Sequence, residues 1–244
     1  MCWSESASVG MVGLGAGAAA VAAYRGQPPA IYLTLLYFTL MEALQAAGYR
    51  VVDDCGSSAN QSITLLSYLH IAFQPFFINA FAMELVPVAV KKRLKRGVYG
   101  LCGLSAASML LQLAPLDFAG SCRPGSPLCA ESLCLVSGNW HIAWNIPYNG
   151  LFVPLESWVG VQGGFPTYML TVFLMPLAYG AWRFVIFHAL AGPILAQLLT
   201  NNPNEFPAVW CLFSIGILLI GLSPLIRSKF EIHSWKTWPK AWQE

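Results

Sequence analysis

The chain has 244 residues, of which 57% are hydrophobic and only 10% are charged. A soluble globular domain carries charge on about 25% of its residues, so this composition excludes a soluble fold. The formal net charge of +2 gives no basic field, which excludes nucleic acid as a partner, and the apolar content excludes intrinsic disorder. The composition is typical of a protein that crosses a lipid bilayer several times.

Apolar segments recur along the chain at about the 20-residue length that crosses a bilayer. We expect an all-α bundle of seven transmembrane helices at residues 7–24, 29–48, 62–89, 97–115, 164–182, 184–200 and 205–225. Residues 1–229 then form a single transmembrane domain. Residues 230–244 form a tail on the inner membrane surface, because Trp235, Trp238 and Trp242 alternate there with Lys236 and Lys240.

Positive charges predict the orientation of the bundle, since Lys and Arg gather in cytoplasmic loops. The run Lys91–Arg96, between the third and fourth spans, carries five of them. If this run lies in the cytoplasm, Arg50 and Arg123 are the only positively charged residues in the segments predicted to lie outside. We therefore predict that the amino terminus lies outside and the carboxyl terminus lies inside.

The first span contains the stretch Gly13–Gly17, whose small residues are spaced so that a neighbouring helix can approach closely. A Gly-rich phosphate loop would need a strand before it, and the sequence predicts none there. We expect Gly13 and Gly17 to pack against another helix.

Residues 139–161 form the least regular apolar segment. They contain two prolines, three asparagines, a histidine and a glutamate, which suit a lipid-exposed span poorly. Irregular backbone at membrane depth is tolerated where protein buries it or where it lines a wet cavity. We predict an outer re-entrant or interfacial element here.

The turn Asn201–Glu205 precedes the last predicted span. Asn, Pro and Glu in this order are typical of a tight connection that ends in a helix N-cap. We assign these residues no role in a site.

Four of the seven cysteines fall in loops predicted to lie outside, where oxidation is permitted: Cys55, Cys122, Cys129 and Cys134. We expect disulfides around the loop 117–139, although four cysteines allow three pairings and the sequence does not choose among them. A zinc knot would need a Cys-x-x-Cys pair, which the sequence lacks. Cys102 and Cys211 lie within spans and are predicted to be small core residues.

Polar side chains interrupt three of the apolar spans and the segment 139–161. An ionisable group at the membrane centre costs about 2.5–3.5 kcal/mol, so its presence needs a reason. Helical spacing puts the polar groups of each span on one face of the helix. The rise per residue puts these groups at a similar depth in the outer half of the membrane. The resulting polar layer holds Glu42, Gln45, Ser67, His70, Gln74, His141 and Asn145, with His188 at its floor.

One interpretation of this layer is a membrane hydrolase that uses zinc. Three ligands, His70, His141 and His188, would leave an open position for a water molecule whose pKa falls toward about 7. Glu42 would act as general base or would orient a ligand, and Ser67 would supply a further polar contact. The substrate would be a lipid-like amide or ester that enters between the helices.

Two other interpretations stay open. The first is a non-enzymatic structural or accessory subunit of another membrane protein, in which the layer is satisfied by internal hydrogen bonds. The second is a haem carrier with His70 and His188 as axial ligands. A transporter is disfavoured, because the sequence shows no internal repeat.

Three stretches of the chain, residues 66–75, 140–150 and 201–211, resemble an uncharacterised bacterial seven-helix family, a domain of unknown function. The resemblance covers nearly the whole chain and brings no known activity. It implies a multi-pass protein of the bacterial inner membrane.

A fainter similarity is to the superfamily of seven-helix zinc hydrolases that includes alkaline ceramidases and adiponectin receptors. Those proteins place a serine, an acidic residue and three histidines around zinc. Ser67 and His70 match this pattern on the third span, and His141 and Asn145 occupy the positions of a His-x-x-x-His pair. The seventh span has no histidine, so the resemblance implies zinc only if His188 takes the third position.

Overall fold

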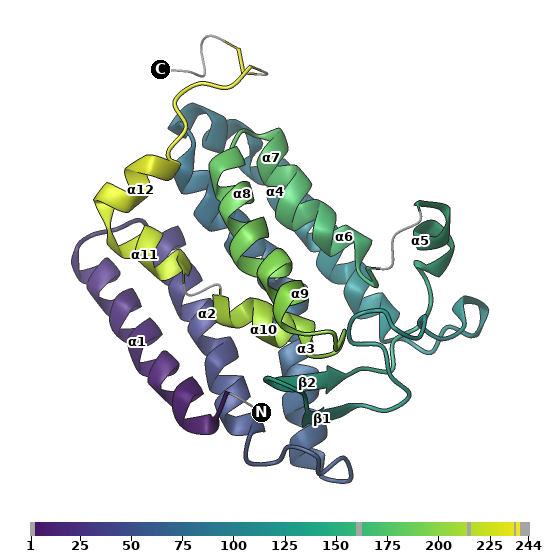
Figure 1. Cartoon of the computed structure of the whole chain (residues 1–244). Coiled ribbons are helices and arrows are strands. Elements are labelled where there is room, and N and C mark those ends of the chain that lie inside the picture. The colour runs from purple at the N-terminus through teal and green to yellow at the C-terminus, as the bar shows by residue number, and fades with distance from the viewer. Residues whose placement is uncertain (1–2, 160–162, 214–215, 237, 240–244) are drawn as a thin grey trace.

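The computed structural model describes residues 3–159, 163–213, 216–236 and 238–239. Its first half is a series of long helices that run up and down the bundle, each beside the one before it (Figure 1). These are α1 (Glu5–Tyr24), α2 (Pro29–Gly48), α3 (Ser58–Ala82) and α4 (Val88–Gln112), with the short 3₁₀ turn η1 (Met83–Leu85) between the last two.

The second half of the bundle consists of shorter helical pieces. One rod is built from α6 (Pro166–Met169), the π turn η3 (Leu170–Leu174) and α7 (Met175–Ala178). A second rod is built from α8 (Trp182–Ala189), the π turn η4 (Leu190–Ile194) and α9 (Leu195–Leu199). The chain then continues through α10 (Phe206–Phe213), α11 (Gly216–Leu222) and α12 (Pro224–Phe230).

Four helices among the described residues are long and apolar enough to cross a bilayer: Glu5–Tyr24, Pro29–Gly48, Ser58–Leu85 and Trp182–Leu199. The rod Pro166–Ala178 is apolar but shorter, and α4 begins with the basic run Lys91–Arg96 and does not meet the same test. Near the end of the last predicted span, the pair Phe206–Leu222 and Pro224–Phe230 passes the test only together, with a bend of 106° between the two helices, and gives a fifth span if the pair is counted as one. The structure therefore confirms several apolar helices of membrane length, and it does not confirm seven.

A proline explains how the first π turn is joined to the rest of the bundle. In a π turn the carbonyl of Thr171 would accept from residue 176, which is a proline and has no N–H. The side-chain amide of Asn79 on α3 donates to this carbonyl instead, at 2.9 Å. The Asn79 oxygen accepts from the Tyr179 hydroxyl at 3.0 Å, so one buried amide ties α3 to both ends of α7.

A two-stranded antiparallel sheet closes one end of the bundle. Strand β1 (Cys134–Ser137) pairs with β2 (Ile142–Asn145), and Cys134 lies opposite Asn145. We call residues 134–145 the hairpin cap and the end that they cover the hairpin end (Figure 1). The expectation of an all-α fold is wrong here. The segment predicted to be an outer re-entrant or interfacial element supplies β2, a loop and α5 (Val153–Val159); residues 160–161 of it lie outside the described residues.

Disulfides join the four cysteines that were predicted to pair. Cys55 in the α2–α3 loop is bonded to Cys134 of β1, and Cys122 is bonded to Cys129. The first bond fastens the hairpin cap to the α2–α3 loop, and the second closes a short loop beside it.

The remaining cysteines agree with their predicted role as far as the structure describes them. Cys102 and Cys211 are free thiols, and both are buried in the helical core. Cys2 lies outside the described residues.

The glycines of α1 pack differently from the prediction. Gly15 faces α2, where an added Cβ would lie 2.1 Å from the Thr39 hydroxyl. Gly13 and Gly17 face outward, and within the described part of the chain a Cβ on either would have no neighbour within 4 Å. The close helix approach therefore depends on Gly15 rather than on the small residues to either side of it.

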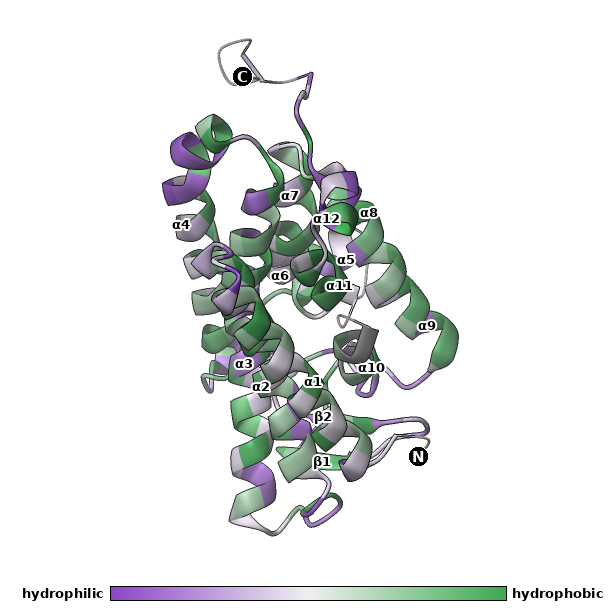
Figure 2. Ribbon diagram, turned by 90° about the vertical axis from the view of Figure 1, so that its left-hand side faces the viewer, coloured by the Kyte–Doolittle hydropathy of each residue, from purple (hydrophilic) through white to green (hydrophobic). Residues whose placement is uncertain are grey.

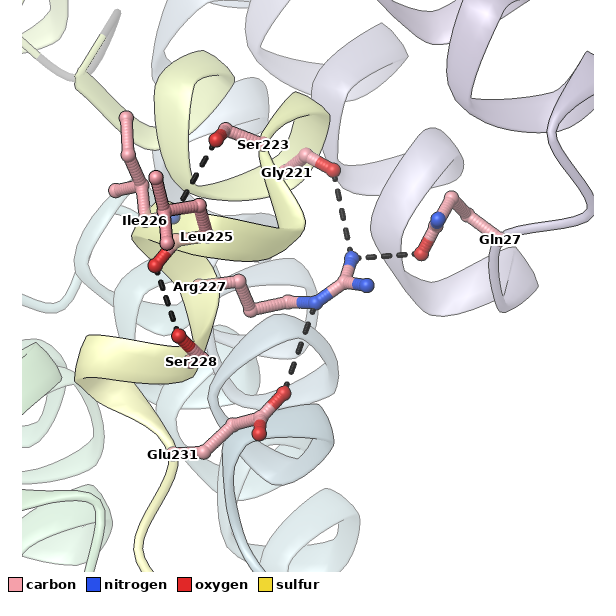
Figure 3. Close-up of polar contacts among 8 residues, drawn as sticks. All are labelled: Gln27, Gly221, Ser223, Leu225, Ile226, Arg227, Ser228 and Glu231. Atoms are coloured by element: carbon pink, nitrogen blue, oxygen red, sulfur yellow. Dashed lines mark hydrogen bonds and ion pairs between the residues drawn. The ribbon is translucent and has the colours of Figure 1, made fainter.

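The end opposite the hairpin cap is basic. The first turns of α4, which hold Lys91–Arg96, form a hydrophilic patch there (Figure 2). Arg227 of α12 donates to the side-chain oxygen of Gln27 at 2.6 Å and to the carbonyl of Gly221 at 3.4 Å, and it lies 3.8 Å from Glu231 (Figure 3). Arg183 donates to the carbonyls of Lys229 and Glu231, so these arginines satisfy carbonyls at helix ends.

The carboxyl-terminal tail lies against this basic end. The backbone N–H of Ile232 donates to Leu85, and the Trp238 indole is buried and donates to the Tyr179 carbonyl at 3.2 Å. Trp242 and Lys240, on which the interfacial prediction also relied, lie outside the described residues.

Candidate functional site

The predicted polar layer consists of buried side chains. Seven of its eight members are at most 5% exposed, and Asn145 is partly exposed. The buried members are Glu42, Gln45, Ser67, His70, Gln74, His141 and His188. What these groups can do therefore depends on which partners their polar atoms have.

His70 forms a reciprocal contact with Tyr37 on the neighbouring helix α2. The Nε2 atom of His70 donates to the backbone carbonyl of Tyr37 at 2.7 Å, and the Tyr37 hydroxyl donates to the backbone carbonyl of His70 at 2.6 Å. The two rings stack with centroids 4.0 Å apart. Because Nε2 must carry the hydrogen in this contact, the lone pair of the neutral ring is on Nδ1.

His141 lies in the turn of the hairpin cap, and its ring has the opposite tautomer. Its Nδ1 accepts the backbone N–H of Ile142 at 2.7 Å and lies 3.3 Å from the Tyr49 hydroxyl. Burial lowers the pKa of His141 to about 3, so the ring is neutral at physiological pH. The ring hydrogen is then on Nε2, which leaves no lone pair there for a metal ion.

His188 lies among aromatic rings on α8. The indole N–H of Trp210 on α10 points to the Nε2 atom of His188 at 3.3 Å, and the rings of Phe173 and Phe184 flank the imidazole at 5.1 and 5.6 Å. Since Nε2 accepts a hydrogen bond, the hydrogen of the neutral ring is on Nδ1. This hydrogen bond joins α8 to α10. We call a side chain that links two segments of the chain in this way a tie.

These tautomers do not fit a zinc site built from three histidines. A ligating imidazole offers a lone pair to the metal, and of the three predicted ligands only His70 keeps an unshared one. Across the described residues, no group of three or more His, Cys, Asp or Glu side chains is arranged to hold a metal ion. Haem ligation by His70 and His188 is no better supported, because Nε2 of each ring is already in a hydrogen bond.

Two further members of the polar layer are also ties. The Tyr168 hydroxyl of α6 donates to the side-chain oxygen of Gln74 on α3 at 2.7 Å. Asn145, at the end of β2, accepts from the side-chain amide of Asn204 at 2.8 Å. Each contact joins segments that are far apart in the sequence.

Glu42, Gln45 and Ser67 differ from the rest of the layer. In the described structure, one carboxyl oxygen of Glu42, both amide atoms of Gln45 and the Ser67 hydroxyl are buried without a hydrogen-bond partner. The hydroxyl of Ser8 on α1 is the hydrogen-bonding group beside the Glu42 carboxyl. The two residues predicted to be catalytic are thus buried, but the three histidines are not gathered around them as a metal centre.

Glu205 is not among the predicted site residues, yet it is fully buried beneath the hairpin turn. Its carboxylate accepts the backbone N–H groups of Asn139, Trp140 and His141, and the Thr200 hydroxyl donates to it at 2.6 Å. The turn interpretation of Asn201–Glu205 is therefore incomplete. No local pattern marks Glu205, because the backbone N–H groups that bind its carboxylate lie more than 60 residues away.

The hairpin cap is fastened on its other side by the α2–α3 loop. The Asp53 carboxylate accepts the backbone N–H of Ser137 at 2.7 Å and its hydroxyl at 2.6 Å. The Asn60 side chain makes hydrogen bonds to both the N–H and the carbonyl of Leu135, each at 2.8 Å. With the Cys55–Cys134 disulfide, these contacts fix the cap over the helix ends.

Enclosed space in the helical core is small. A cavity of about 20 Å³ is lined by Glu42, Thr39 and Cys211, and a second, of about 60 Å³, by Gln74, Tyr168 and Cys211. Sites for drug-sized ligands measure about 300–1,000 Å³, so these cavities are too small for a lipid chain. An open apolar groove of about 660 Å³ runs along α2 and α3 on the outside, where a bilayer would cover it.

The chain matches the family of unknown function DUF5765 over residues 6–231, and it therefore belongs to that family. No significant match was found among curated proteins or among solved structures.

Proposed function

We propose that this DUF5765 protein is a non-enzymatic scaffold of the membrane, a structural or accessory subunit that holds the hairpin cap at the outer surface. The observation that carries this proposal is the way the predicted site residues are used. A ring nitrogen of each of His70, His141 and His188 is hydrogen-bonded to a neighbouring aromatic residue or backbone group, and such contacts are typical of polar side chains that join segments of a membrane protein.

The hairpin cap supports the same proposal. It is fastened by a disulfide, by the buried carboxylate of Glu205 and by Asp53 and Asn60. Fastening at so many points preorganises the cap, which lowers the entropy cost of binding a partner protein. We infer that the partner is another membrane protein, and that the bilayer covers the apolar sides of the bundle.

We propose seven spans with the amino terminus outside. The disulfides and the basic run lie at opposite ends of the bundle, which supports this orientation. Both disulfides lie at or beside the hairpin end, and Lys91–Arg96 lies at the other end. Reporter fusions at Lys92 and Pro127 test it. We expect an inside signal at Lys92 and an outside signal at Pro127, and the reverse pair of signals would overturn the orientation.

Metal analysis and an absorption spectrum of the purified protein test the absence of enzymatic metal or haem chemistry. We expect no stoichiometric zinc, no Soret band and no rise in melting temperature when zinc is added, because a ligand that binds the folded state raises its stability. Stoichiometric zinc that is lost in His70→Phe would overturn the proposal in favour of the hydrolase. A Soret band lost in the same variant would favour the haem carrier.

A further inference from the structure

Three glutamates of the described chain are almost completely buried. The exposed fractions of Glu42, Glu156 and Glu205 are 5%, 4% and 0%. A carboxylate anion that has lost its water needs hydrogen-bond donors or a cation in its place, and without them the group is neutral instead. The donors around each glutamate therefore indicate its charge.

Glu205 and Glu156 are surrounded by donors. The Glu205 carboxylate accepts three backbone N–H groups and the Thr200 hydroxyl. Glu156 accepts the backbone N–H groups of Gly163, at 3.1 Å, and of Gly164. Both of these glutamates therefore have the backbone N–H donors that stabilise the charged form of a carboxyl.

Glu42 lacks this environment. Its Oε2 atom has no hydrogen-bond partner in the described part of the chain, and the Ser8 hydroxyl is the donor beside its carboxyl. The ion pairs that the structure describes are made by Glu5, Glu84 and Glu231, not by Glu42. Within the described residues, the Glu42 carboxyl thus has one hydroxyl and no cation to offset its burial.

Among the described residues, the elements around Glu42 supply no strong base. Helix α1 presents Ser8, and α11 presents the apolar side chains of Ile217 and Leu218. The titratable groups nearby are Cys211 of α10 and Tyr49 at the end of α2. A thiol and a phenol are neutral acids at physiological pH, so neither removes the Glu42 proton.

A polar face of α2 leads from Glu42 to the hairpin end. Gln45 and Tyr49 follow Glu42 by three and seven residues, which places all three on one side of the helix. Both amide atoms of Gln45 are buried and unpartnered in the structure as described, and the Tyr49 hydroxyl contacts His141 of the hairpin cap. The cavity of about 20 Å³ beside Glu42 has room for one water molecule.

We propose that Glu42 is a proton-binding site inside the membrane, and that it exchanges its proton with the solution at the hairpin end along the Gln45–Tyr49 face. The ligand is the proton alone, bound at the carboxyl oxygen that has no protein partner. This inference does not rest on the scaffold proposal, because a neutral Glu42 is compatible with a protein that has zinc and with one that lacks it.

Infrared difference spectroscopy tests the protonation directly. A protonated carboxyl has a carbonyl stretching band that a carboxylate and an amide lack, so the spectrum of the wild type minus that of Glu42→Gln should show this band. Glu205→Gln and Glu156→Gln are the matched controls, since both residues are equally buried and we expect no band to disappear with either. A wild-type spectrum that matches Glu42→Gln in this region overturns the proposal.

Labelling with a hydrophobic carbodiimide tests the exchange. The O–H of a protonated carboxyl adds across one C=N bond of the reagent, and the acyl group then moves to nitrogen and leaves an N-acylurea, so no further reactant is needed. Peptide mass spectrometry should find the label on Glu42 and not on Glu156 or Glu205. Labelling should fall as the pH is raised, and labelling that does not change with pH overturns the exchange.

Sodium ions separate a proton site from a general cation site. We expect labelling at constant pH to be the same in sodium chloride and in choline chloride. Protection of Glu42 by sodium would show that the carboxyl binds the metal ion as well, and it would overturn a site for the proton alone.

Discussion

The ring of His70 donates to the backbone of Tyr37, and the hydroxyl of Tyr37 donates back to the backbone of His70. Each of these two side chains on adjacent helices thus donates to the backbone of the other residue without water. Such pairs allow a chain with 57% hydrophobic residues to place polar groups inside an apolar bundle. This reciprocity distinguishes a tie from a ligand site, because the hydrogen-bonded atoms have no free valence for a substrate.

The first prediction concerns this pair. His70→Phe and Tyr37→Phe keep the stacked rings, and each removes one of the two hydrogen bonds. Interhelical hydrogen bonds in membranes average about 0.6 kcal/mol, so we expect each variant to lower the free energy of unfolding by about that amount per bond. Thermal unfolding in detergent measures it. A His70→Phe protein that keeps its melting temperature but loses a bound cofactor would contradict the tie.

The second prediction concerns Glu205. In Glu205→Gln an amide NH₂ replaces one of the oxygens that face the N–H groups of the hairpin turn. A buried polar group left unsatisfied costs about 1–3 kcal/mol, so this variant should unfold at a lower temperature and expose the hairpin cap to protease. Glu131→Gln, at an exposed position, is the control and should change stability by less than about 0.5 kcal/mol. Equal stability of the two variants would show that the carboxylate does not hold the cap.

Residue patterns predicted the helices well where the signal is local. Residues 29–48 were expected to form a span and form α2, since a proline at the first turn and a continuous apolar run both act within the segment. The oxidised cysteines were likewise predictable from their place in polar loops. Their pairing was not, because Cys55 and Cys134 are 79 residues apart and only the folded hairpin brings them together.

The hairpin cap and the candidate site depended on tertiary contacts that the sequence does not encode locally. Strands of four residues give too short an alternation to be distinguished from an interfacial segment. The depth of each histidine followed from the helical rise, but its ring orientation followed from partners such as Ile142 and Trp210. A layer of polar residues could therefore be predicted. Which of its members are hydrogen-bonded ties, and which have unpartnered atoms as Glu42 has, could not.

The third prediction compares the two disulfides. Closing a loop removes entropy from the unfolded chain in proportion to the logarithm of loop length, which gives about 4.5 kcal/mol for a separation of 79 residues and about 2.5 kcal/mol for one of 7. Replacing Cys55 and Cys134 by serine should therefore lower the melting temperature more than replacing Cys122 and Cys129. Calorimetry of the two double variants measures the order, and the reverse order would show that the short loop contributes more to stability.

The fourth prediction concerns acid. Burial lowers the pKa of His141 from 6.5 to about 3, so between these values the unfolded chain binds a proton that the folded chain does not. The neutral His141 ring therefore contributes its full stability above pH 6.5. Below pH 6.5 the free energy of unfolding falls by about 1.4 kcal/mol for each pH unit, down to about pH 3. His141→Gln should flatten this slope when unfolding is followed from pH 7 to pH 4. His233→Gln, at an exposed position, should leave the slope as it is.

The last prediction separates the two faces of α1. Gly15→Ala would place a methyl group 2.1 Å from the Thr39 hydroxyl, and α1 would have to move away from α2. Overpacking of this kind costs about 1–3 kcal/mol, so the melting temperature in detergent should fall.

Gly13→Ala adds the same methyl group where the described residues leave 4 Å of open space, and alanine in a helix is about 0.5–1 kcal/mol more stable than glycine. Gly13→Ala should therefore leave the melting temperature unchanged or raise it. If Gly13→Ala destabilises the protein as much as Gly15→Ala, the outward face of α1 is packed against another helix in the membrane.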